Sequence, residues 1–128
     1  MSLDLSDVPD ELRDAVKAAL GVAGVEEGHL AVEIVDPDRI RDLNREHRGI
    51  NLPTDVLAFP VDGPGPSQGP RELGDVVVCP EQCSSVREAV VHGVLHLCGF
   101  DHEVDSGEML ALQAKAMATL QEPRPLDS

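Results

Sequence analysis

Hydrophobic and polar positions follow two periods along this chain, one typical of helices and one typical of strands. Apolar residues three and four positions apart, together with capping signals, predict helices at residues 9–23, 37–48, 86–98 and 106–120. The third segment is apolar around nearly its whole circumference, so we expect a buried, central helix. Ser85 and Glu88 form a capping box before it, and Gly99 stands where it would end in a left-handed residue.

Shorter apolar runs predict the strands. They lie at residues 29–35, 54–59 and 73–79, with a short further strand at 2–5. The run at 73–79 contains three consecutive valines, which favours burial on both faces of a sheet. We therefore expect an α+β fold, in which a small mixed β-sheet of about three to four strands packs with helices around the central helix.

The chain length of 128 residues fits one domain, expected over residues 1–121. The proline-containing end, 122–128, is predicted to be a disordered tail. The chain contains no run of 18 apolar residues and no basic, apolar leader at its start, so we expect a cytoplasmic protein without membrane association. Three cysteines, an odd number, fit reduced thiols in that compartment.

Charge and aromatic content limit the possible partners. The chain has 24 acidic and 10 basic side chains, a formal net charge of −14, which repels polyanions over most of the surface. Phe59 and Phe100 are the only aromatic rings of the Phe, Tyr or Trp type, too few for a base-stacking platform. Any contact with a nucleic acid must be local or assisted by a partner.

The strongest chemical signal is the segment 92–102, which reads His-Gly-Val-Leu-His-Leu-Cys-Gly-Phe-Asp-His. His92 and His96 are four residues apart, so on a helix they lie on one face and can bind one ion. If the chain turns back after Gly99, His102 can supply a third ligand. Three imidazoles with an open fourth position are typical of catalytic zinc, and Asp101 is a candidate to orient a ligand.

Position 93 narrows the reaction class. Zinc peptidases of the His-Glu-x-x-His kind carry their general base directly after the first histidine, and here that residue is Gly93. Ordinary proteolysis is therefore disfavoured. Glu88 lies one turn before His92 and is an alternative base, although its place in the capping box already accounts for it.

The helix at 37–48 carries two stripes. Ile40, Leu43 and His47 are expected to share an inward face. Arg41, Arg45 and Arg48 line another, which suits either phosphate binding or a solvated face paired with acidic neighbours. The composition of the helix favours the solvated face.

Three stretches make the chain resemble the YbeY family of metal-dependent endoribonucleases. The family motif H-G-x-L-H-L-x-G-Y-D-H matches residues 92–102 with Phe100 in place of tyrosine. The motif Leu-Asn-x-x-Tyr-Arg, followed by Pro-Thr-Asp-Val-Leu-Ser-Phe-Pro, matches residues 43–48 and 53–60 with two substitutions. A third motif, Leu-Gly-Asp-Val, begins at Leu73, and the segment between it and the histidine helix is shorter than the family usually has.

The resemblance implies one Zn²⁺ per chain, bound by His92, His96 and His102, with His92 and Arg48 catalytic. It implies cleavage of single-stranded RNA in maturation of small-subunit ribosomal RNA and in ribosome quality control. The expected partners are this RNA and components of the small ribosomal subunit. Arg48, Arg45 and Arg41 are the expected phosphate-binding residues. Asp55 and Asp75, the acids of the shorter motifs, are expected to support the site with Asp101.

Two other functions remain open from the residues alone. One is a non-catalytic ribosome-assembly factor with a structural metal, for which Cys98 or Asp101 would have to supply a fourth ligand. The other is a metal-dependent hydrolase of a small ester or amide substrate. The attacking group of an RNA-cleaving enzyme is also open between water and the RNA 2′-OH.

Overall fold

A mixed sheet of four strands lies at the centre of the computed structural model, which describes residues 3–61, 72–100 and 107–121. The order across the sheet is β1-β2-β4-β3, and the strands span Leu3–Asp4 (β1), Gly28–Ile34 (β2), Val56–Pro60 (β3) and Glu72–Val78 (β4). β2 pairs with β1 and β4 in parallel, whereas β3 pairs with β4 in antiparallel orientation. The predicted small mixed sheet is confirmed.

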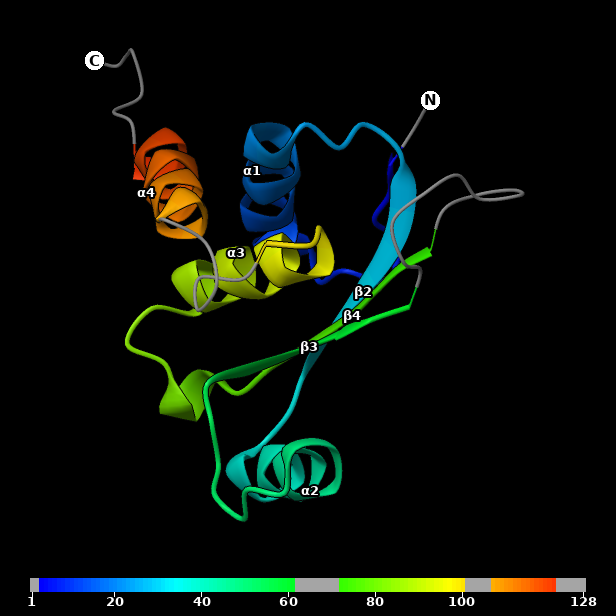
Figure 1. The fold of residues 1–128 in the computed structure, drawn as a ribbon, viewed down its shortest axis with the longest axis vertical. Helices are drawn as coiled ribbons and strands as arrows, with labels where there is room; N and C mark the ends of the chain where they lie inside the picture. Colours follow the sequence, from blue (N-terminus) through cyan, green and yellow to red (C-terminus); the bar gives the residue numbers. More distant parts are fainter. Residues whose placement is uncertain (1–2, 62–71, 101–106, 122–128) are drawn as a thin grey trace.

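Helices cover both faces of this sheet (Figure 1). Three lie on one face, α1 (Arg13–Ala23), α3 (Val86–Leu97) and α4 (Glu108–Gln121), and α2 (Pro37–Arg48) lies on the other. α3 contacts β3 and β4 directly, and α1 and α4 both pack against α3. α3 is therefore the buried central helix that its composition predicts.

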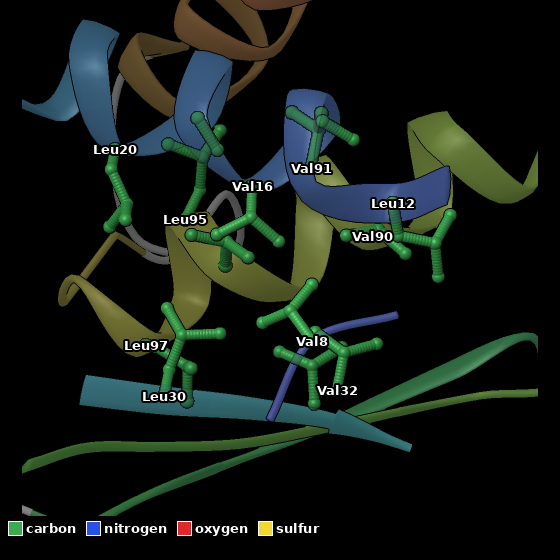
Figure 2. Close-up of a cluster of buried hydrophobic side chains, with 14 of the residues drawn as sticks. Val8, Leu12, Val16, Leu20, Leu30, Val32, Val90, Val91, Leu95 and Leu97 are labelled. Atoms are coloured by element: carbon green, nitrogen blue, oxygen red, sulfur yellow. The ribbon is translucent and has the colours of Figure 1, made fainter. Parts of the chain in front are cut away.

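Two apolar clusters form the core, one on each face of β4. Figure 2 shows the larger cluster, where side chains from α1, α3 and β2 meet. Val76 and Val78 belong to that cluster, while Val77 belongs to a smaller one with Ile40 of α2. Because successive side chains of a strand point to opposite faces, three consecutive valines are all buried, as predicted.

The local signals in the sequence correspond to observed caps. The Asp36 side chain accepts a hydrogen bond from the Arg39 backbone N–H at 2.8 Å, at the start of α2. Ser85 Oγ accepts one from the Glu88 N–H at 3.2 Å, at the start of α3. Gly99 follows α3 with φ of 98°, a conformation that favours glycine and turns the chain away from the helix.

Gly93 marks the point where α3 comes closest to the sheet. A Cβ atom at this position would lie 2.9 Å from Val76 Cγ1 and 3.1 Å from Val56 Cγ2. A side chain here would therefore point into the sheet. The absence of the peptidase glutamate from this position thus has a steric reason as well as a chemical consequence.

The predicted tail, 122–128, lies outside the described residues. No helix in the described part of the chain is long and apolar enough to span a membrane. The helix predicted from residue 9 begins as a short 3-10 turn, Asp10–Leu12, before α1.

Candidate active site

A cavity of about 710 Å³ opens beside α3. Among the described residues, its lining comes from the last residue of α2, most of β3 with the two residues before it, α3 with its flanking residues, and one residue of α4. The polar side chains that matter for chemistry are Arg48, Asp55, Glu88, His92, His96 and Gln113. The cavity therefore joins segments from both faces of the sheet.

The two histidines of α3 meet inside this cavity. His92 Nε2 and His96 Nε2 are 3.2 Å apart, and the ring centroids are separated by 4.7 Å at 77°. Both side chains are half-buried. The i, i+4 spacing has thus brought two nitrogens to one point, as the sequence predicts.

The outer nitrogen of His92 is held by the last helix. His92 Nδ1 lies 2.8 Å from Gln113 Oε1, and Gln113 Nε2 donates to Glu88 Oε2 at 3.1 Å. Gln113 is a residue that the sequence reasoning missed. A signal was present, since Gln113 is a polar position on the α4 stripe of Met109 and Ala116, both fully buried.

The three arginines predicted to share one stripe of α2, Arg41, Arg45 and Arg48, separate in space. Arg48 lines the cavity. Arg41 and Arg45 do not, and they form ion pairs one turn away, with Asp38 at 3.7 Å and Asp42 at 3.4 Å. Their geometry is that of a solvated, charge-paired helix face.

The predicted inward face of α2 is confirmed for Ile40 and Leu43, and His47 also faces the sheet, although its side chain is not buried. Ile40 is fully buried, whereas His47 is exposed, with its ring centroid 4.7 Å from that of Phe59. The buried polar residue is instead Asn44, whose Nδ2 donates to the Leu52 carbonyl at 2.9 Å. Asn44 thereby holds the loop that leads from Arg48 to β3.

The carboxylates predicted to support the site are divided. Asp55 lines the cavity and is exposed. Asp75 is exposed on the face of β4 that carries Val77, opposite α3, and does not line the cavity. Asp101 and the third predicted ligand, His102, lie outside the described residues.

The cysteines contribute no ligand to this cavity. The Cys83 thiol donates to the Cys79 carbonyl at 3.2 Å, and burial, followed by the nearby Asp55 carboxylate, raises the Cys83 pKa. A raised pKa keeps sulfur protonated at neutral pH, where it is a poor ligand. Cys98 packs partly buried against the core and does not line the cavity.

The donor set fits a borderline-soft divalent cation. Two neutral imidazole nitrogens 3.2 Å apart oppose each other's lone pairs unless a proton or a cation lies between or beside them. Within residues 3–61, 72–100 and 107–121, no group of three histidine, cysteine or acidic side chains could hold a metal ion. A three-ligand site therefore needs a ligand outside these ranges, where the predicted ligand His102 lies.

Fold and cavity together define an α+β protein with a histidine pair in a polar cavity. Over residues 2–121 the sequence matches the family described as Endoribonuclease YbeY. Proteins of that description from Nitrobacter hamburgensis and Salinispora tropica are each 37% identical to this chain, over 87% and 90% of it and 69% and 89% of their own length. The solution structure of a Thermotoga maritima protein aligns with a TM-score of 0.53 at 28% identity, covering 92% of this chain and 87% of that one.

The chain belongs to the YbeY family. It is thus a member of a family of enzymes described as endoribonucleases, which are hydrolases of RNA phosphodiester bonds.

Proposed function

We propose that this chain is a zinc-dependent endoribonuclease that cleaves single-stranded RNA during maturation of small-subunit ribosomal RNA and in ribosome quality control. The observation that carries the proposal is the meeting of two histidine Nε2 atoms in a cavity that Arg48 also lines. His92, His96 and His102 would hold one zinc ion. When bound, zinc supplies a Lewis acid and lowers the pKa of a coordinated water to about 7.

The side chains of the cavity have separate tasks in this proposal. The Arg48 guanidinium binds phosphate oxygens in a bidentate manner and offsets the charge that develops on them during cleavage. His92 and His96 keep their Nε2 atoms directed into the cavity. Arg45 and Arg41, which pair with neighbouring acids outside the cavity, contribute less to phosphate binding than Arg48.

Charge sets the conditions under which RNA binds. Asp55 and Glu88 line the same cavity as Arg48, and the whole chain carries a formal net charge of −14. Binding of a polyanion to such a surface is weak and falls further with salt. Components of the small ribosomal subunit therefore supply part of the affinity, and the protein acts in the cytoplasm.

The test combines metal content with cleavage of a labelled single-stranded RNA. We expect about one zinc per chain by mass spectrometry, loss of zinc in His96→Ala and loss of cleavage in His92→Ala and Arg48→Ala. Arg45→Ala is the matched control, because it removes the same side chain from the same helix outside the cavity. It should retain most of the cleavage rate.

Other outcomes would point elsewhere. Bound zinc without cleavage, alone or with small-subunit components, would favour a non-catalytic assembly factor. Equal losses in Arg48→Ala and Arg45→Ala would show that the arginines act by general charge. Absence of metal from the wild type would refute the zinc site.

A further inference from the structure

Hydrogen bonds between α3 and α4 beside the histidines have a fixed order of donors and acceptors. This order determines which ring nitrogen of His92 carries the proton. Glu88, Gln113 and His92 form a chain of two hydrogen bonds, of 3.1 Å and 2.8 Å. Glu88 and His92 are one turn apart on α3, and Gln113 reaches them from α4. Only this residue of α4 lines the cavity among those described.

An ionised carboxylate can only accept hydrogen bonds, so the amide NH₂ of Gln113 must face Glu88. Its carbonyl oxygen then faces His92 Nδ1, as it does in the structure. A carbonyl also only accepts. A neutral His92 must therefore carry its proton on Nδ1, and its Nε2 lone pair points to the position shared with His96 Nε2.

We propose that Gln113 and Glu88 are positioning residues that hold His92 in the Nδ1–H tautomer, so that Nε2 is the donor atom presented to a metal ion. Residues that hydrogen-bond the second nitrogen of a ligand histidine fix its tautomer and orientation. We call the hydrogen-bonded chain Glu88–Gln113–His92 the relay. Its role in metal binding rests on the proposed metal-dependent function, but its effect on the His92 tautomer can be tested without metal. It gives α4 a direct part in the active site.

An alternative explanation is that these hydrogen bonds only hold α3 and α4 together and do not determine the tautomer of His92. The two explanations differ when donor and acceptor are exchanged. In the double variant Glu88→Gln with Gln113→Glu, the residue at 113 still accepts from Nδ1–H and the residue at 88 donates to it. The order of donors and acceptors at His92 is thus preserved, whereas Gln113→Leu removes the acceptor that faces Nδ1–H.

The test measures the His92 tautomer by long-range ¹H–¹⁵N NMR on metal-free protein in alkaline solution. We expect Nδ1–H in the wild type, its loss in Gln113→Leu, partial loss in Glu88→Gln and recovery in the double variant. Thr119→Leu, an exposed change on the same helix, is the control. Circular dichroism verifies that each variant is folded.

Zinc affinity, from competition with a coloured chelator, gives the second measurement. Gln113→Leu should weaken it about 10–100-fold, and the double variant should recover most of this loss. An unchanged Nδ1–H tautomer in Gln113→Leu, or failure of the double variant to recover it, would overturn the relay. If the tautomers behave as expected and the wild type binds no zinc, the relay stands and the proposed metal function fails.

Discussion

Replacement of Gly93 by alanine tests how closely α3 packs on the sheet. The new Cβ would lie 2.9 Å from Val76 Cγ1 and 3.1 Å from Val56 Cγ2. Val76 is fully buried and β-branched, so it has little freedom to move away. Overpacking of this kind costs about 1–3 kcal/mol, while the better helix propensity of alanine returns about 1 kcal/mol.

The expected net result is a loss of about 1 kcal/mol in the free energy of unfolding. In a domain of this size, that loss lowers Tm by about 3–5 °C. Urea unfolding followed by far-UV circular dichroism is the appropriate assay, because the chain has no tryptophan or tyrosine to report by fluorescence.

Gly21→Ala provides a matched control. Gly21 is also inside a helix, α1, but a Cβ there would meet nothing within 4 Å. This variant should gain about 0.5–1 kcal/mol from helix propensity alone. If Gly93→Ala were as stabilising as Gly21→Ala, the close packing of α3 on β4 and the steric exclusion of a glutamate from position 93 would both be refuted.

Three further changes test other parts of the molecule. The Asp7 carboxylate and then that of Glu72 raise the pKa of His29, so the stability from this ion pair is complete below the unfolded pKa of about 6.5 and is lost as pH rises through the higher folded pKa. His29→Gln should therefore cost about 0.5–1 kcal/mol near pH 6 and little in alkaline solution; a pH-independent cost in chemical unfolding would contradict this. Asn44→Ala should cost about 1–2 kcal/mol and slow RNA cleavage, since the Leu52 carbonyl loses its donor, whereas the exposed Asn51→Ala should do neither. Cys83→Ser should leave zinc content and cleavage unchanged, because the protonated thiol of Cys83 is not a ligand; loss of zinc would show otherwise.

Local sequence signals predicted the elements of this fold well. The limits of α2, Pro37–Arg48, are set by the N-cap Asp36, by Pro37 and by Gly49. They were predictable because capping depends on groups only a few residues away. The meeting of His92 and His96 follows equally from the helical period. The order of the strands was not predictable in this way, because the insertion of β4 between β2 and β3 depends on packing between distant segments.

The sequence reasoning was least complete for residues whose surroundings come from another element. His47 has the helical spacing of an inward residue and its ring contacts that of Phe59 on β3, yet its side chain is exposed. Gln113 is a polar residue on a stripe of buried apolar positions of α4. Its hydrogen bonds to His92 and Glu88 of α3 explain why it is polar. A polar residue on a stripe of buried apolar positions is therefore a useful signal of a site formed between two elements.

The acidic surface and the cavity impose different requirements on the proposed nuclease. The proposed catalysis needs one guanidinium and correctly placed metal-binding nitrogens, and the cavity provides Arg48 together with the paired histidines. Affinity for RNA needs many cations, and α2 neutralises two of its arginines with its own acids. In the function proposed above, such a chain would separate chemistry from affinity, discriminate against free RNA and cleave where a partner presents the strand to the cavity.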